Sequence, residues 1–292
     1  VIVSTPGRFL DIYSRGYIDV KRLKHIVLDE ADRMMDMGFM PQIRKIQEVV
    51  PTKRQNILFS ATFPIRVENL AKEFLLWPTR IEVTTESTAA VTITQYKLPL
   101  PNHRTKIAFI EWYVREKLKD DRLLIFTRRK EEAENLFKYL DRSFDTEVRA
   151  VHSNKGQNTR INSMQDFRTG AVQILIATDV ASRGIDVPET KWVINASVPR
   201  DPRDYIHRIG RTGRAFREGS ALTLVDPAER FALERIESFT GEALHDFPDP
   251  PKLEQFETPR QEKQNQAREI DREMRKRDPN YKMQPIARPN YF

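Results

Sequence analysis

Residues 172–186 read VQILIATDVASRGID, an apolar run that passes directly into a polar segment containing a glycine. Apart from Gln173, the run up to Ala177 is apolar on both faces, which is typical of a strand buried within a parallel sheet. Amphipathic stretches of helical length lie on either side of it, at 156–169 and 202–209. Strands that alternate with helices in this way predict an α/β fold in which helices cover a parallel sheet.

The same alternation extends through most of the chain. We predict strands at 1–3, 25–28, 55–59, 80–83, 94–98, 122–126, 147–151, 172–177, 192–195 and 220–224. We predict helices between them at 40–50, 64–74, 104–118, 130–144, 156–169, 202–209 and 228–239.

A polar stretch without helical periodicity interrupts the pattern and predicts a linker at 85–91. A second domain at 92–241 has enough strands to be complete, whereas the first, at 1–84, has too few and is expected to be incomplete. Residues 242–292 combine many charges of both signs with few apolar residues. We therefore expect a charged, mostly disordered tail, with a charged helix near 261–276 as its one ordered part.

The composition limits the function only broadly. The 292 residues include 49 Lys and Arg against 42 Asp and Glu, a formal net charge of +7, which suits a polyanionic partner or simply a basic protein. The chain has no cysteine, which excludes disulfides and thiolate metal sites and fits a cytoplasmic location. No apolar run approaches the ~20 residues that a membrane-spanning helix needs, so no membrane partner is expected.

An acidic cluster, Asp29-Glu30-Ala31-Asp32, follows the predicted strand at 25–28. In open α/β sheets the carboxyl ends of the strands face the ligand. Asp29 could therefore hold Mg²⁺ through water beside nucleotide phosphates, and Glu30 could orient or deprotonate an attacking water. From this tetrapeptide alone, an acidic helix N-terminus remains an alternative.

Two short motifs of the first half each allow a functional and a structural interpretation. Ser60-Ala61-Thr62 follows a predicted strand, where its hydroxyl groups could bond a carboxylate such as Asp32 or cap the next helix. Thr5-Pro6-Gly7-Arg8 closes the first predicted strand and could bind a phosphate or form an ordinary turn.

The second half contains HRIGRTGR at 207–214. Its two glycines allow close approach of the backbone to a ligand, and Arg211 and Arg214 carry permanent forked cations that suit phosphate. An arginine directed at a γ-phosphate accelerates phosphoryl transfer by roughly 10³–10⁵. A basic surface loop is the alternative, which the accompanying motifs disfavour.

Together, these motifs resemble those of DEAD-box RNA helicases, a branch of superfamily two, in order and approximate spacing: TPGR at 5–8, DEAD at 29–32, SAT at 60–62, ATDVASRGID at 177–186 and HRIGRTGR at 207–214. The sequence is similar overall to the bacterial RhlE-like group. The resemblance covers residues 1 to about 240. It implies two RecA-like domains, the first incomplete here, that close on ATP and a single RNA strand.

The resemblance also implies roles for individual residues. The expected catalytic residues are Asp29 and Glu30, which resemble the Mg²⁺-holding and water-activating acids, and Arg211 and Arg214, which resemble arginine fingers. Further contacts on the nucleotide side are expected from Gly184, which allows close packing, and Asp186, which resembles the ribose contact. Coupling of hydrolysis to duplex opening is expected from Asp32, Ser60, Thr62 and His207. Contacts along the RNA backbone are expected from Thr5, Gly7, Arg8, Arg128, Gln157, Arg160 and Thr178.

The chain also departs from the family pattern. It contains no G-x-x-x-x-G-K-[ST] loop, which in the family belongs upstream of Val1 together with the adenine-binding motif. Ala196-Ser197 stands where the family commonly has Tyr-Asp, which removes a carboxylate at a strand end. Two other functions therefore stay open, a non-catalytic RNA-binding fragment and a DNA-directed enzyme of the same superfamily. The tail could contact RNA, hold a protein partner or do neither, and we assume a monomer.

We predict that this chain alone hydrolyses ATP at no more than the background rate, because half of the phosphate site lies outside it. An RNA-stimulated ATPase assay of the purified chain checks this. Turnover comparable with that of a complete helicase would contradict the prediction.

Overall fold

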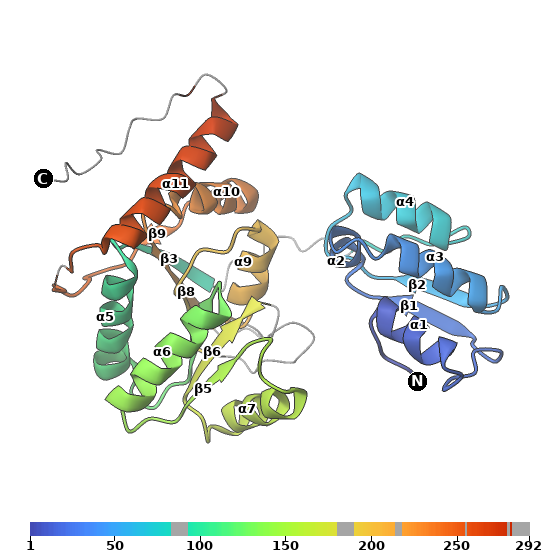
Figure 1. Cartoon of the computed structure of the whole chain (residues 1–292), viewed down its shortest axis with the longest axis horizontal. Coiled ribbons are helices and arrows are strands. Elements are labelled where there is room, and N and C mark those ends of the chain that lie inside the picture. Colours follow the sequence, from blue (N-terminus) through green and yellow to red (C-terminus); the bar gives the residue numbers. More distant parts are fainter. Residues whose placement is uncertain (83–92, 180–189, 214–217, 255, 279–280, 282–292) are drawn as a thin grey trace, which may run out of the picture. The chain divides into compact units, whose positions relative to one another are not determined.

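The computed structural model describes residues 1–82, 93–179, 190–213, 218–254, 256–278 and 281 (Figure 1). It divides into two compact units, Val1–Thr84 and Thr85–Phe292. The predicted linker at 85–91 lies outside the described residues. Each unit is considered by itself below.

The first unit places helices around a two-stranded parallel sheet. Its elements are α1 (Pro6–Ser14), β1 (His25–Leu28), α2 (Ala31–Asp36), α3 (Met40–Val49), β2 (Gln55–Leu58) and α4 (Ile65–Phe74). The two strands pair in register from His25 with Gln55 to Leu28 with Leu58. Apolar side chains of α3 and α4 pack with those of the strands into a small core that includes Ile43, Leu70 and Phe74.

Two strands predicted for this unit are absent from its described part. Val1–Val3 is exposed and pairs with no described strand, and residues 80–82 form no strand. An apolar run forms a stable strand only where a neighbouring strand satisfies its backbone N–H and C=O groups. The predicted turn at 5–8 instead opens α1, with Pro6 at the first helical position, where its missing N–H costs nothing.

The second unit is built on a seven-stranded sheet of order β5-β6-β4-β7-β8-β3-β9, parallel throughout. The strands are β3 (Ile93–Pro99), β4 (Leu123–Thr127), β5 (Val148–Val151), β6 (Ile174–Thr178), β7 (Trp192–Asn195), β8 (Gly219–Val225) and β9 (His245–Asp246). All residues of β4 and β6 are buried, as the apolar runs predicted. The predicted α/β fold with a parallel sheet is confirmed.

Helices cover both faces of this sheet (Figure 1). They are α5 (His103–Tyr113), which continues into a π-helical turn, η1 (Val114–Leu118), α6 (Lys130–Ser143), α7 (Gln157–Thr169), α9 (Pro202–Ile209) and α10 (Arg230–Thr240). Alternate residues of β4 separate the two cores, because Leu123 and Ile125 pack with α5 and α6 whereas Leu124 and Phe126 pack with α7. The helices α9 and α10 share a further core on the α7 side with Ala221.

The prediction of a disordered tail at 242–292 is wrong for the first part of that segment, which belongs to the second unit. The strand β9 pairs with β3, and the ring of Phe247 packs edge-on against Phe109, with their centroids 5.5 Å apart. The charged helix expected near 261–276 is present as α11 (Arg260–Arg277). Arg235 of α10 donates to Glu273 of α11 at 2.8 Å. Ion pairs of this kind and the ring of Phe247 hold the segment to the second unit, although it has few apolar residues.

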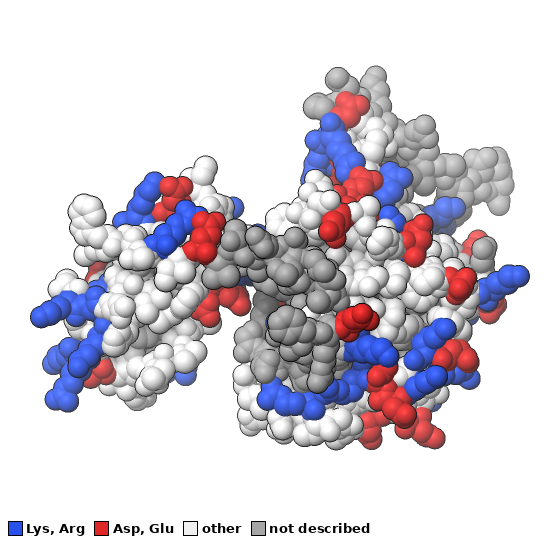
Figure 2. All heavy atoms as spheres, turned by 180° about the vertical axis from the view of Figure 1, so that it is seen from behind, with Lys and Arg blue, Asp and Glu red and all other residues white. Residues whose placement is uncertain are grey.

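Charged groups of both signs are distributed over the surface. In the view of Figure 2, Lys and Arg side chains are interspersed with Asp and Glu in each unit, without a broad surface of one sign. Among the described helices, none has the length and apolar character needed to cross a membrane.

We predict that Phe247→Ala lowers the free energy of unfolding of the second unit by about 3 kcal/mol, because it empties a space between Tyr96 and Phe109. Urea unfolding followed by tryptophan fluorescence measures this, since Trp192 belongs to the same aromatic cluster. The matched control Phe239→Ala removes a ring that is 52% exposed and is expected to change the value by less than about 0.5 kcal/mol. Equal effects of both variants would show that the segment around Phe247 is not docked.

Candidate nucleotide and nucleic-acid site

In the first unit the acidic cluster lies at the carboxyl end of β1, as expected. Asp29 and Glu30 are both exposed, and the Glu30 N–H donates to Asp29 Oδ1 at 2.9 Å. Glu30 has a left-handed backbone, with φ of +52°, which is uncommon for a residue with a side chain. The bend separates β1 from α2 and leaves both carboxylates accessible to a ligand.

The third acid of the cluster faces inward and joins the two motifs of this unit. Asp32 is buried, and its Oδ2 accepts hydrogen bonds from Thr62 Oγ1 at 2.7 Å and from the Thr62 N–H at 3.2 Å. The Asp32 N–H donates to Ser60 Oγ at 3.1 Å, and Ser60 Oγ donates to Thr62 O at 2.7 Å. The predicted contact between the hydroxyl motif and this carboxylate is thus present in the structure.

The residues at Asp29 fit a weakly held Mg²⁺. The described part of the chain contains no group of three or more acidic, histidine or cysteine side chains able to hold a metal by itself. Mg²⁺ commonly keeps several waters and binds one or two carboxylates together with nucleotide phosphates. A single accessible carboxylate such as Asp29 meets that requirement, with Glu30 next to it.

In the second unit, Arg208 of the HRIGRTGR motif is buried and bonds other residues of the fold. Arg208 of α9 is 1% exposed, and its guanidinium donates to Asp179 Oδ1 at 2.6 Å and to Oδ2 at 2.8 Å. It also donates to Asn195 Oδ1 at 3.2 Å and to Ser197 O at 2.8 Å, and it lies over the ring of Phe126. A bidentate pair of this kind is strong and geometrically specific.

The pair between Arg208 and Asp179 was missed by the sequence reasoning. Both residues stand inside the two motifs that were quoted, ATDVASRGID and HRIGRTGR. The glycines, Arg211 and Arg214 of these motifs predict contacts with a ligand and give no sign of this pair. Arg208 carries a permanent charge and lies with Tyr205 and Ile209 on the buried face of its helix. A charge at such a position could have indicated a buried partner.

The other expected nucleotide residues of this unit are only partly described. Arg211 and His207 are half-buried, and Arg211 O accepts from the Thr190 N–H at 3.0 Å, which ties the motif to the segment before β7. Gly184, Asp186 and Arg214 lie outside the described residues.

In the second unit, the residues expected to contact RNA lie at the carboxyl ends of adjacent strands or on the helix that follows one of them. Arg128 follows β4, Thr178 ends β6, and Gln157 and Arg160 lie in the first turn of α7, which follows β5. Because β5, β6 and β4 are neighbours and parallel, these residues lie along one edge of the sheet. Arg160 donates to Gln157 Oε1 at 3.3 Å, so two of the four are in contact.

The remaining expected RNA contacts lie in the first unit, at the start of α1. Thr5 is the N-cap residue and Gly7 is in the first turn, both exposed. Arg8 is exposed and pairs with Asp11 at 2.5 Å, a surface pair of small energy that a phosphate could replace.

A further charged group supports the loop that leads into α7. His152 is buried, and its Nε2 lies 3.0 Å from Glu134 of α6, which also bonds Lys155 at 3.0 Å. The hydrogen bonds from His152 and then from Lys155 lower the pKa of Glu134 below its ordinary value. The loop before Gln157 is therefore held by an ionised carboxylate.

Comparison with known proteins agrees with this picture. Residues 1–70 match the family profile described as DEAD/DEAH box helicase, and residues 105–216 match the helicase conserved C-terminal domain. The ATP-dependent RNA helicase dbp3 of Schizosaccharomyces pombe is 39% identical over 259 residues, which cover 85% of this chain and 44% of that protein. DBP2 of Eremothecium gossypii is 38% identical over 250 residues, covering 85% and 45%.

Solved structures give the same result for the fold. A structure of S. cerevisiae Dbp5 bound to RNA and ADP BeF3 is similar with a TM-score of 0.74 and 33% identity, covering 84% of this chain and 64% of that one. A structure of Dbp5 L327V bound to Gle1 H337R and IP6 has a TM-score of 0.64 at 32% identity, covering 85% and 65%. This chain spans less than half the length of the two curated relatives.

The parallel α/β fold of this chain matches that of helicases with RecA-like domains, as its similarity to the Dbp5 structure shows. Within that class, the chain belongs to the DEAD-box RNA helicase family. The expected affinity to the bacterial RhlE-like group is not supported, because the curated relatives named above are eukaryotic Dbp3 and Dbp2 helicases.

We predict that Arg208→Ala lowers the free energy of unfolding of the second unit by about 3 kcal/mol, because it removes the bidentate guanidinium from the Asp179 carboxylate and its bonds to the strand ends. The control Arg230→Ala removes a guanidinium that is mostly exposed and pairs only loosely with Glu234, and is expected to stay within about 0.5 kcal/mol of wild type. Urea unfolding of the two variants measures the difference. Equal stabilities would contradict a structural role for Arg208.

Proposed function

We propose that the protein to which this chain belongs is an RNA-dependent ATPase that uses Mg-ATP to unwind or remodel short RNA duplexes. The observation that carries the proposal is the buried contact between Asp32 and Thr62, because it links the acidic motif directly to the hydroxyl motif. Family membership and the similarity to a Dbp5 structure with RNA and ADP BeF3 support the same activity.

Each acidic residue of the first unit has a distinct part in this proposal. Asp29 binds Mg²⁺ through water, and Glu30 orients and deprotonates the water that attacks the γ-phosphate. The bound Mg-ATP supplies the phosphoryl group and its counter-ion. Arg211 and Arg214 provide positive charge where negative charge develops on that group, which requires both units to meet at the nucleotide.

Coupling follows from the position of Asp32. Its carboxylate is in the same short segment as Glu30 and accepts two hydrogen bonds from Thr62. A shift of the acidic segment on nucleotide binding therefore moves the loop that follows β2. His207, half-buried on α9, is the proposed contact from the second unit to that segment.

The proposed RNA contacts go to phosphate and sugar, which makes binding independent of sequence and sensitive to salt. They comprise Thr5, Gly7 and Arg8 in the first unit and Arg128, Gln157, Arg160 and Thr178 in the second. Gly184 and Asp186 complete the nucleotide side. A protein partner held by residues 242–292, a monomeric state and a cytoplasmic location stay predictions.

A second candidate function is that of an RNA-binding module without catalysis. The second unit favours it, because it has a complete parallel sheet and carries its RNA residues on one edge. A chimera distinguishes the two functions: the part of S. pombe dbp3 that precedes the matched region is joined to Val1. RNA-stimulated ATPase activity of this chimera supports the enzyme, RNA binding without turnover supports the module, and stimulation by DNA as strong as by RNA contradicts both.

In this chimera we predict that Glu30→Gln reduces turnover at least about a hundredfold, because the amide cannot accept the proton of the attacking water. Binding of RNA in the presence of ATP should stay close to that of the unchanged chimera. The control Glu48→Gln neutralises an exposed acid of α3 and should leave both values unchanged. ATPase rates and fluorescence anisotropy of labelled RNA measure the two properties, and an equal loss of both would remove the water-activating role from Glu30.

A further inference from the structure

The first unit carries a group of cations that make no ion pair with any residue the structure describes. Most of its other arginines and lysines do pair with a carboxylate, namely Arg8, Arg15, Arg44, Arg66, Lys72 and Arg80. Five exposed side chains have no such partner among the described residues, Lys21, Arg22, Lys24, Lys45 and Lys53. Positive charge that the fold does not neutralise is therefore concentrated in a few segments of this unit.

Four of these cations lie at the amino end of the two parallel strands. Lys24 directly precedes β1, and Lys53 stands two positions before β2. The Gln55 N–H donates to Lys24 O at 2.8 Å, so the two segments adjoin. Lys21 and Arg22 belong to the turn that leads into Lys24. This is the opposite end of the sheet from the acidic motif, which follows the carboxyl end of β1.

A groove of about 620 Å³ lies beside these cations, between the end of α1 and the end of α3. Its lining is mainly aliphatic. Ile18, Val49 and Pro51 are half-buried, and Val20 and Val50 are buried beneath them. The groove is therefore suited to one or two apolar side chains of a binding partner.

The cations border this groove. Lys21 is part of its lining, and Lys45 stands on α3 one helical turn before Val49, on the same side of the helix. The acids of this region are Asp19, whose Oδ1 accepts from the Lys21 N–H at 2.8 Å, and the exposed Glu48. Five cations against these two acids leave an excess of positive charge at the rim.

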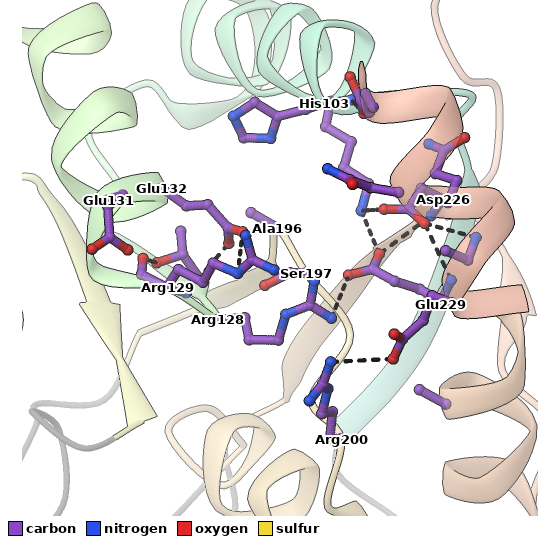
Figure 3. A pocket seen from close by; sticks show the side chains of 18 of the residues that line it. His103, Arg128, Arg129, Glu131, Glu132, Ala196, Ser197, Arg200, Asp226 and Glu229 are labelled. Carbon is purple, nitrogen blue, oxygen red and sulfur yellow. Dashed lines mark hydrogen bonds and ion pairs between the residues drawn. The ribbon is translucent and has the colours of Figure 1, made fainter. Parts of the chain in front are cut away.

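A cavity of about 700 Å³ in the second unit has a different character (Figure 3). Its Arg128 lies 3.8 Å from Glu229, and its Arg200 pairs with Glu269 at 3.1 Å. These cations are engaged within the fold. The groove of the first unit instead combines apolar walls with cations that have no described partner, and such a combination selects a partner by charge as well as by shape.

We propose that this groove and its five cations form a docking site for an acidic segment of a partner protein. Branched or aromatic side chains of that segment enter the groove between Ile18 and Val49, and its carboxylates face Lys21, Lys45 and Lys53. Burial of the apolar side chains supplies affinity, and the charges direct the approach and the choice of partner. A nucleic-acid strand matches the site less closely, because its phosphates need cations along a continuous track and make no use of aliphatic walls.

The site is separate from the RNA contacts proposed for this unit. Those residues, Thr5, Gly7 and Arg8, stand at the start of α1, whereas the groove is lined by Tyr13 and Gly16 at its end. The nine residues of α1 span about 13 Å, so a short segment in the groove leaves the start of the helix uncovered. The acidic segment and RNA therefore bind together, and the inference does not depend on catalytic activity.

The test uses the 292-residue chain and a library of short random peptides displayed on phage. Selection is expected to enrich peptides that carry several acidic residues next to leucine, isoleucine or phenylalanine. An enriched peptide is synthesised with a fluorescein label, and fluorescence anisotropy measures its affinity. A selection that enriches no peptides, or peptides without this pattern, would overturn the proposal.

Reversal of two charges distinguishes a docking site from general attraction to a basic protein. Lys21→Glu combined with Lys53→Glu is expected to weaken binding of the labelled peptide at least about tenfold. The control, Lys117→Glu combined with Lys138→Glu, makes the same change in net charge on exposed positions of the second unit and should alter the affinity by less than about twofold. Equal losses would show that the peptide responds to net charge alone, which would contradict a defined site.

The apolar part of the site is tested by Ile18→Ala, which leaves the charge unchanged and is expected to weaken binding about fivefold. The control Ile65→Ala shortens an exposed side chain at the start of α4 and should bind as wild type does. If circular dichroism shows that Ile18→Ala unfolds the first unit, the lysine variants decide, because their side chains are exposed. Equal affinities of folded Ile18→Ala and its control would overturn the proposal, and so would displacement of the peptide by unlabelled oligo-U RNA, which would assign the surface to nucleic acid.

Discussion

The buried guanidinium of Arg208 is the interaction on which the carboxyl edge of the second unit depends. It joins the residue after β6, Asp179, to the end of β7 at Asn195, and it lies over Phe126 of β4. Three neighbouring strand ends are thereby fixed by one side chain. Arg128, Thr178, His207 and Arg211 each stand within three positions of these contacts, whereas Gln157 and Arg160 are placed separately by α7.

The first unit uses a different kind of link for a similar purpose. There a single carboxylate, Asp32, accepts hydrogen bonds from Thr62. Because Asp32 is buried, breaking these bonds would leave a buried charge unsatisfied, so they join the acidic motif to the loop after β2. Each unit thus uses a carboxylate to join two of its motifs at the strand ends.

The sequence predicted six of the seven strands of the second unit to within one or two residues, because runs such as 123–127 and 174–178 are buried on both faces, and it missed only the two-residue strand β9. It failed where formation depends on a partner. Val1–Val3 has strand composition but no described neighbour, and the helix α11 looked unanchored because its contacts, such as that of Glu273 with Arg235, are ionic rather than apolar.

The cations at the edge differ in how firmly they are held, and this difference decides which of them can serve a ligand. Arg208 and Lys106 are buried and make bonds of 2.6 and 2.5 Å to carboxylates, so neither can turn toward a phosphate without leaving a buried charge. Arg128 lies 3.8 Å from Glu229 and is partly exposed. The structure therefore uses Arg208 and Lys106 to hold the fold, whereas Arg128 is bound less tightly to its carboxylate.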